Sequence, residues 1–417
     1  MLTIEAVPLS PWRPATRVAF RFFTIYFVLY VVTTQMLGAL INLPIGSPPR
    51  VGALMHPLVA WTGDHVFHVS ARPVISGSGD KLYDWVQAFC LLVIACGGTM
   101  LWSILDWRRA AYDRAHRWFH VFLRFALGST MIGYGFAKAF PLQMPAPQLT
   151  RLLEPYGNFS PMGVLWYSIG ASFPYERFTG IVEVAGGALL FVPRTQLAGV
   201  LLLLGATFQV FMLNMTYDVP VKLFSFHLFV MSAVLFAPHA SSMCALVFGT
   251  GARSRWAAVA QIGTGIYLVG MAFYGTWQGW QTRGPAASKP PLYGIWTIEK
   301  MTIDGAERPP LITDEERWRR VVVQNAAGIA FWRMDDTVLQ YSSKVDTGAR
   351  TIALSTAPAN GSGAGTLAYN QTAADRLVLD GTVGPHAVHM ETRLVDHTRF
   401  LLLSRGFHWV QEFPFNR

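Results

Sequence analysis

Seven stretches of the chain are apolar over lengths that approach the thickness of a lipid bilayer. They run from Val18 to Ile41, Tyr83 to Leu105, Phe119 to Phe140, Phe178 to Val192, Leu197 to Tyr217, Val221 to Phe236 and Trp256 to Tyr274. A helix needs roughly 20 apolar residues to cross the hydrocarbon layer, so two of these stretches are short. The pattern predicts a membrane bundle of about seven transmembrane helices within residues 1–283.

The composition agrees with a membrane protein. Hydrophobic residues make up 52% of the chain and charged residues only 14%, which is well below the roughly 25% of soluble domains. Residues 289–417 carry 14 basic and 14 acidic side chains, so the whole net charge of +9 lies before them. Cytoplasmic loops and anionic lipid account for such an excess of cations, and we therefore expect no nucleic-acid partner.

Basic residues occupy every second short loop between the apolar stretches. They are Arg13, Arg17 and Arg21, then Arg108, Arg109, Arg114 and Arg117, then Arg194, and finally Arg253 and Arg255. Positively charged loops remain in the cytoplasm, so the pattern predicts a cytoplasmic amino terminus and an extracytoplasmic carboxyl-terminal part. No small-residue cleavage site follows the first stretch, which we expect to be a retained helix rather than a signal peptide.

A different pattern begins after a Gly/Pro/Ala/Ser linker at residues 284–291. Short alternating segments predict strands at Gly294–Ile303, Trp318–Gln324, Gly328–Met334, Thr337–Ser343, Arg350–Ser355, Thr366–Tyr369, Arg376–Leu379, Ala387–Leu394 and Arg399–Ser404. Turns are expected at Asp304-Gly305, Asp335-Asp336, Asn360-Gly361 and Asp380-Gly381. Residues 292–417 are therefore predicted to form a small antiparallel all-β domain, a barrel or a sandwich.

Two short motifs resemble those of the DoxX family of membrane proteins. They are Tyr134-Gly-Phe-Ala-Lys138 and Glu183-Val-Ala-Gly-Gly187, the latter followed by Pro193-Arg194. The resemblance implies a four-helix core at about residues 118–240 and a bacterial inner (plasma) membrane location. DoxX is associated with a membrane-bound thiosulfate-to-quinone oxidoreductase, whereas most relatives have no assigned reaction, so the resemblance does not decide whether the chain is an enzyme.

Several polar side chains are predicted to share one depth near the outer surface. If alternate helices run in opposite directions, the third to sixth bring together Lys138, Glu183, Asn214, Asp218, Lys222 and His227. With Tyr134, these residues are the candidate ligand site. A charge within the bilayer costs several kcal/mol unless it faces the bundle and finds a partner. We therefore expect the pairs Lys138 with Glu183 and Asp218 with Lys222.

The same residues have a purely structural interpretation. Asp218 precedes Val219-Pro220 and could cap the next helix, while the lysines could extend to lipid headgroups. Lys222 resists this interpretation, because a cation in the first helical turn is disfavoured by the helix dipole. Lys222 is therefore expected to meet an acidic partner or an anionic ligand. Arg124, about 21 Å from Lys138 by helical rise, is expected to contact lipid.

The β domain resembles the lipocalins in one pattern. Gly294-Ile-Trp296 lies on the first predicted strand and Arg405 follows the last. In lipocalins an arginine packs across the tryptophan that closes the barrel, so the resemblance implies that Trp296 and Arg405 form this closure. The aromatic segment Gly406–Arg417 is expected to pack on the barrel or on the membrane face.

Metal ligands are sparse. Asp64, His65 and His68 form one weak set and His116 with His120 another, and neither has a second ligand pair opposite it. We therefore expect no metal site. The three cysteines give no disulfide framework.

Three functions remain open. In the first, the polar cluster binds a lipid-soluble molecule, by resemblance a non-covalent quinone, within a membrane redox system that requires a partner subunit. In the second, the protein is a non-enzymatic carrier or chaperone that passes an apolar ligand between bundle and barrel. In the third, it is a structural or assembly subunit of a membrane complex, in which the cluster only joins helices.

The topology can be tested with fused reporters. A reporter fused after Arg417 is expected to be active only outside the cytoplasm, because seven crossings separate it from the cytoplasmic amino terminus. A reporter inserted between Trp107 and Arg117 is expected to be active only inside. A cytoplasmic carboxyl terminus would contradict the predicted orientation.

Overall fold

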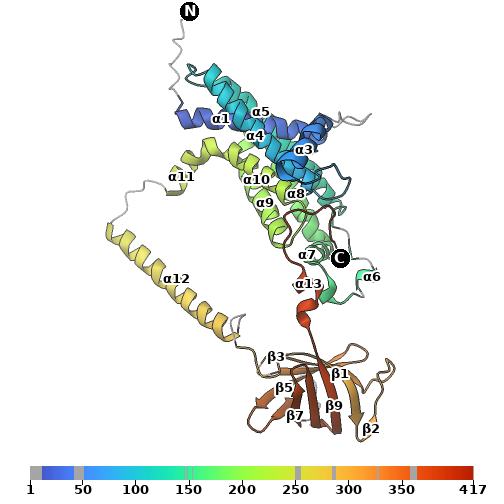
Figure 1. Cartoon of the computed structure of the whole chain (residues 1–417). Helices are drawn as coiled ribbons and strands as arrows, with labels where there is room; N and C mark the ends of the chain where they lie inside the picture. The colour runs from blue at the N-terminus through green and yellow to red at the C-terminus, as the bar shows by residue number, and fades with distance from the viewer. Residues whose placement is uncertain are drawn as a thin grey trace, which may run out of the picture. The chain divides into compact units, whose positions relative to one another are not determined.

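The structure is a computed structural model in which the chain divides into two compact units. One unit comprises Met1–Thr250 together with Leu401–Arg417, and the other comprises Gly251–Phe400. The structure describes residues 12–41, 51–144, 146–147, 149–152, 154–248, 255–283, 288–325, 328–356 and 364–416. Figure 1 shows both units, and each is described here by itself.

The first unit is helical. Its long helices are α1 (Pro14–Thr33), α4 (Leu82–Leu105), α5 (Asp113–Ala139), α8 (Phe173–Phe191), α9 (Gln196–Thr216) and α10 (Lys222–Phe236). Shorter elements connect them, namely α2 (Met36–Leu40), η1 (Val51–Met55), α3 (His56–Thr62), η2 (Gly63–Phe67), α6 (Leu149–Leu152), η3 (Tyr156–Asn158), α7 (Pro161–Gly170), η4 (Ala237–His239) and α11 (Ala240–Phe248). The last turn of helix in the chain, α13 (Leu401–Ser404), belongs to the same unit.

A helix lies at each of the seven predicted membrane spans, but they are not equally apolar. In the described part of the chain, four helical segments are long and apolar enough to cross a membrane: Pro14–Thr33, Leu82–Leu105, Gln196–Thr216 and Lys222–Leu246. The remaining three predicted spans correspond to α5, α8 and α12 (Arg255–Arg283), the last of which lies in the second unit. Charged side chains such as Arg124, Lys138 and Glu183 interrupt the apolar character of α5 and α8. The predicted first span also ends early, at Thr33 rather than Ile41.

Glycines allow α5 and α8 to pack in close contact. A Cβ atom on Gly180 would lie 2.5 Å from the carbonyl oxygen of Gly135, and one on Gly187 would lie 2.7 Å from that of Gly128. Such distances exclude any larger residue, because real Cβ atoms do not approach backbone atoms so closely. The close contact places the polar residues of the two helices opposite one another.

The second unit contains a closed β-barrel. Its strands are β1 (Gly294–Ile303), β2 (Ala306–Glu307), β3 (Trp318–Asn325), β4 (Gly328–Arg333), β5 (Val338–Asp346), β6 (Thr351–Thr356), β7 (Gly365–Ala373), β8 (Arg376–Val383) and β9 (His386–Val395). Consecutive strands from β3 to β9 pair antiparallel, and β1 pairs with both β3 and β9. Eight of the described strands therefore form a closed barrel, which removes the exposed sheet edges. The two-residue β2 extends the end of β1.

The interior of the barrel is filled by apolar side chains. On β1, Trp296, Ile298, Met301 and Ile303 are buried, and a bulge between Ile298 and Lys300 keeps the later pair facing inward. The indole of Trp296 donates to the carbonyl oxygen of Leu292 at 2.9 Å. An eight-stranded barrel is just wide enough for side chains to fill it.

Two local predictions in the β domain are wrong. Arg399–Ser404 is not a strand, because His397–Arg399 form a 3-10 turn and Leu401–Ser404 a short helix. Asp380-Gly381 is not a turn but lies inside β8. Gly381 has a φ of +149°, and a Cβ atom there would lie 2.0 Å from the carbonyl oxygen of Thr366. Gly381 therefore marks a close approach of two strands rather than a reversal of the chain.

Two other predicted features lie partly or wholly outside the residues that the structure describes. The Asn360-Gly361 turn and the first four linker residues, 284–287, lie outside the described residues. The turn at Asp304-Gly305 is present, since both residues have a positive φ, of 51° and 81°.

The barrel is expected to fold without the helices. The segment Lys289–Phe400, expressed alone, should give β-type circular dichroism and a cooperative thermal transition. Trp296→Ala should lower its free energy of unfolding by about 3–5 kcal/mol, because it empties a large volume in the core. Trp332→Ala is the matched control, since Trp332 is only half-buried on β4 and should cost clearly less. Equal losses would show that Trp296 is not the centre of this core.

Candidate functional site

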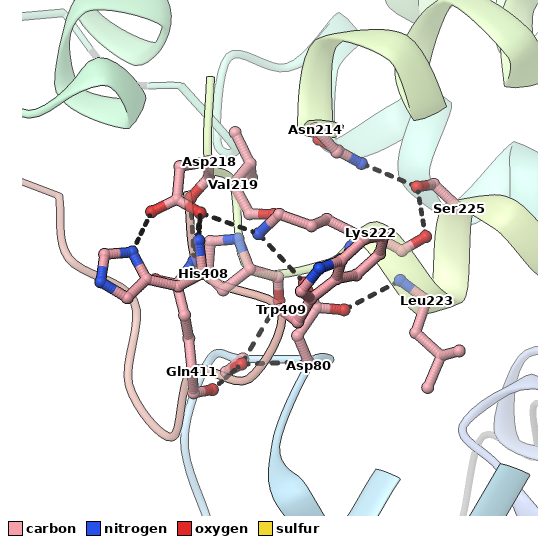
Figure 2. A network of polar contacts seen from close by, with 12 residues as sticks. Asp80, Asn214, Asp218, Val219, Lys222, Leu223, Ser225, His408, Trp409 and Gln411 are labelled. Carbon is pink, nitrogen blue, oxygen red and sulfur yellow. Dashed lines mark hydrogen bonds and ion pairs between the residues drawn. The ribbon is translucent and has the colours of Figure 1, made fainter. Parts of the chain in front are cut away.

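A carboxylate from a distant loop caps the amino terminus of α10. Asp80, which precedes α4, is fully buried. Its Oδ2 accepts from the backbone N–H of Lys222 at 2.9 Å and its Oδ1 from that of Leu223 at 2.8 Å. Figure 2 shows these contacts. Asp80, rather than Asp218 of the preceding turn, thus satisfies the free N–H groups of this helix end.

Lys222 lies between two carboxylates. Its Nζ is 3.5 Å from Oδ2 of Asp80 and 3.1 Å from Oδ1 of Asp218, and it donates to the carbonyl oxygen of Val219 at 3.1 Å. The side chain is 1% exposed, and its ammonium lies 5.0 Å from the centre of the Phe407 ring. The predicted Asp218–Lys222 pair is confirmed. So is the expectation that a cation in this first helical turn requires an acidic partner.

The carboxyl-terminal segment supplies the remaining partners of Asp218. The backbone N–H of His408 donates to Asp218 Oδ1 at 2.9 Å, and Nε2 of Gln411 donates to the same oxygen at 2.9 Å. Nη2 of Arg405 lies 3.0 Å from Asp218 Oδ2. We call Asp80, Asp218, Lys222, Arg405, His408 and Gln411 the tail network, part of which is drawn in Figure 2.

Arg405 therefore has a role other than the one its lipocalin-like position implies. The lipocalin-like pattern implies that its guanidinium packs over Trp296 of the barrel. Instead it bonds to Asp218 and to Oε1 of Gln411 at 2.8 Å, and lies 4.5 Å from the centre of the Phe415 ring. The short helix α13 separates β9 from Arg405, so the arginine belongs to the helical unit.

The carboxyl-terminal segment also binds the loop that carries Asp80. The hydroxyls of Ser76 and Ser78 donate to the carbonyl oxygens of Glu412 and Gln411 at 2.6 and 2.5 Å. The backbone N–H of Gln411 donates to the carbonyl oxygen of Asp80 at 2.9 Å. The segment therefore packs on the helical unit, and the predicted alternative in which it packs on the barrel is wrong.

The two carboxylates of the tail network differ in their proton affinity. Burial raises the pKa of Asp80 above its ordinary value, although hydrogen bonds from Leu223 and Lys222 act in the opposite direction. Burial also acts to raise the pKa of Asp218. Hydrogen bonds from His408 and Lys222 outweigh it, and the pKa of Asp218 lies below its ordinary value. Because the described polar groups satisfy one another in this way, the network serves to fasten chain segments together.

A separate cavity of about 360 Å³ lies beside the tail network. It is bounded by α5, α7, α8, α9 and α10, and most of its lining is apolar, with Met131, Trp166, Phe178 and Phe224 among the larger side chains. Val219, Pro220 and Val221, which connect Asp218 to Lys222, also line it. The tail network thereby holds one wall of the cavity in place.

A buried ion pair faces this cavity from α5 and α8. The ammonium of Lys138 is paired with Oε1 of Glu183, and both residues line the cavity. Both are less than 9% exposed. The second carboxylate oxygen, Glu183 Oε2, is buried and has no hydrogen-bond partner among the described residues. The predicted Lys138–Glu183 pair is confirmed, and it leaves one acceptor unsatisfied.

The other predicted site residues divide between the cavity and its surroundings. Tyr134 and Asn214 line the cavity, and Nδ2 of Asn214 donates to Oγ of Ser225 at 3.0 Å. His227 does not line it. Its Nε2 lies 2.7 Å from the hydroxyl of Tyr26, and its ring stacks on Tyr30 at 3.9 Å between centres. His227 therefore joins α10 to α1. The depth of a residue along its helix does not predict which helices are neighbours.

One wall of the cavity is not predicted by the sequence pattern. Residues 141–172 lie between two of the predicted apolar stretches, and they contain α7; Gln143, Met144, Trp166 and others from this region line the cavity. A local signal was present, since Ser160 followed by Pro161 is a typical helix start. The hydroxyl of Ser160 indeed accepts from the backbone N–H of Gly163 at 3.0 Å.

The weaker histidine sets do not assemble a metal site in the described part of the chain, where no group of three His, Cys, Asp or Glu residues could hold an ion. Asp64 forms a salt bridge with Arg72 at 2.8 Å. The rings of His116 and His120 are 4.1 Å apart.

Comparisons with models of protein families, with curated proteins and with solved structures give no match to this chain. The site must therefore be interpreted from its own geometry.

The tail network can be tested by a double-mutant cycle. Lys222→Met should lower the stability of the purified protein by about 3–5 kcal/mol, because it leaves the carboxylate of Asp80 buried without its cation and removes one of the two cations beside Asp218. Adding Asp218→Asn should recover part of this loss, with a coupling of roughly 1–3 kcal/mol. The exposed pair of Arg72 and Asp64 is the matched control, for which the coupling should be at most about 1 kcal/mol. Thermal unfolding in detergent measures all variants, and strictly additive effects of Lys222 and Asp218 would contradict the pairing.

Proposed function

We propose that the helical unit is embedded in a membrane and binds a lipid-soluble molecule with a polar head in the cavity beside Lys138 and Glu183. The observation that carries the proposal is the ion pair on the wall of a mostly apolar cavity, with one carboxylate oxygen that has no partner among the described residues. A ligand that donates a hydrogen bond to the Glu183 carboxylate would complete its hydrogen bonding.

Embedding in a membrane is supported by the four long apolar helices. In this proposal α5, α8 and α12 cross as well, which gives the seven spans and the orientation deduced from the arginines. The charged residues of α5 and α8 do not prevent this, because Lys138 and Glu183 neutralise one another inside the bundle. The barrel unit would then lie outside the cytoplasm.

The chemistry of the pair indicates the kind of ligand. Lys138 offers a donor and Glu183 an acceptor at one position, while the aromatic and methionine side chains suit an apolar body. A quinone, the ligand that the DoxX-like motifs suggest, combines these features, since its ring oxygens accept hydrogen bonds in the oxidised form and donate them when reduced. Bound quinone would supply the redox chemistry, and electrons would come from a partner subunit.

The carrier hypothesis, in which the ligand passes between bundle and barrel, finds less support. The described interior of the barrel is a packed core around Trp296, Phe331 and Met390. We therefore place the ligand in the helical unit alone.

The test is the retention of a small molecule during purification. The double variant Lys138→Met with Glu183→Gln removes both charges of the ion pair and so leaves no unpaired charge in the cavity. We expect it to retain isoprenoid quinones or other lipids at least about tenfold less than the unmodified protein, because hydrogen bonds to charged groups contribute roughly 1.5–3 kcal/mol. Mass spectrometry of solvent extracts, expressed per mole of protein, gives the measurement.

His227→Gln provides the matched control. His227 is buried at the same end of the bundle but does not line the cavity, so its variant should lower the melting temperature and leave ligand retention unchanged. An unchanged set of bound molecules in the double variant, together with a lowered melting temperature, would show that the Lys138–Glu183 pair only joins helices.

A further inference from the structure

A second cavity lies at the other end of the helical bundle. Its volume is about 390 Å³, and its polar lining consists of His116, Arg117, His120, Arg124, Gln196 and His239. These residues come from the first part of α5, the start of α9 and the η4 turn that follows α10. Arg124 is separated from Lys138 by about 21 Å along α5, so this cavity is independent of the one proposed above.

The charges around this cavity have one sign. Two arginines and three histidines line it, and no acidic residue does. Neither Arg117 nor Arg124 forms a salt bridge in the part of the chain that the structure describes. Asp113, at the start of the same helix, does not line the cavity and instead accepts from the indole of Trp12 at 3.2 Å.

Arg124 is held by neutral groups. Its Nη1 donates to Oε1 of Gln196, and its Nε donates to the carbonyl oxygen of His120 at 3.3 Å. These bonds fix the direction of the guanidinium without neutralising it. Arg124 lies half-buried three turns into α5, beyond the loops where the positive-inside pattern places its arginines. A cation at such a depth requires a negative partner.

The chemistry of the lining identifies the partner. A metal ion is disfavoured, because the two arginines would repel it. A carboxylate from the chain would have to come from the described lining, which contains none. Arginine presents a planar fork of donors that matches the oxygens of a phosphate group, and histidines can add further donors at the rim. Basic pockets between membrane helices bind lipid headgroups in this manner.

We propose that this cavity binds a phosphate-bearing anion through Arg117 and Arg124, with His116, His120 and His239 as further donors. The phosphate belongs either to the headgroup of an anionic phospholipid or to a small soluble phosphate compound. In both cases the two arginines carry the charge recognition.

The test uses the purified, delipidated full chain and two probes. Phosphatidylglycerol in mixed micelles, followed by native mass spectrometry, measures lipid binding, with zwitterionic phosphatidylcholine, whose net charge is zero, as the comparison. Inorganic pyrophosphate, titrated calorimetrically, measures binding of a soluble phosphate. We expect Arg124→Gln and Arg117→Gln each to weaken binding of the recognised probe about fivefold, and the double variant about thirtyfold.

Arg194→Gln is the matched control, because it removes one positive charge at the same end of the bundle from an exposed residue that does not line the cavity. It should bind both probes as the unmodified protein does.

Should Arg124→Gln fail to fold, the exposed Arg117→Gln variant still gives a result. Selective loss of phosphatidylglycerol assigns the site to a lipid headgroup, and selective loss of pyrophosphate assigns it to a soluble phosphate. The inference is overturned if the arginine variants bind both probes unchanged, if Arg194→Gln weakens binding equally, or if the unmodified protein binds neither.

Discussion

The position of α10 depends on the burial of Asp80 against its first turn. Two backbone N–H groups and the ammonium of Lys222 meet this one carboxylate, which is fully buried. Because an unpaired charge in such a place costs several kcal/mol, the contact with Asp80 stabilises the position of α10 against the loop before α4. Asp218 extends the same arrangement to Arg405, His408 and Gln411. Charge neutralisation thus links Asp80 through Lys222 and Asp218 to Arg405, which lies more than 300 residues further along the chain.

The tail network and the cavity are adjacent, but they differ in how completely their polar groups are paired. In the network, the described donors and acceptors satisfy one another, and the result is a fixed turn between α9 and α10. In the cavity, the close contact of Gly135 with Gly180 sets Lys138 opposite Glu183, and one carboxylate oxygen has no partner among the described residues. Polar groups that are fully paired stabilise a fold, whereas a buried ion pair that lines a cavity and leaves one acceptor unpaired is suited to a ligand. This difference directs the functional proposal to Lys138 and Glu183.

The two ends of the bundle offer contrasting environments. At one end an ion pair without net charge faces an apolar cavity, which suits a largely apolar molecule. At the other end, Arg117 and Arg124 face a cavity without any acidic lining residue, which suits an anion. A bundle with both properties can be anchored through lipid or phosphate at one end and hold a lipid-soluble molecule at the other.

The sequence by itself determined the apolar helices, the change to an all-β domain near residue 290, and the ion pairs Lys138–Glu183 and Asp218–Lys222. These follow from local pattern, helical rise and the cost of unpaired charge, which the sequence contains. Only the tertiary structure decided that Asp80 caps α10, that His227 contacts Tyr26 and Tyr30, and that Arg405 belongs to the helices. Each of these depends on which distant segments become neighbours. Which segments become neighbours depends on packing and on the neutralisation of buried charges over the whole chain. The spacing of residues within one segment does not contain this information.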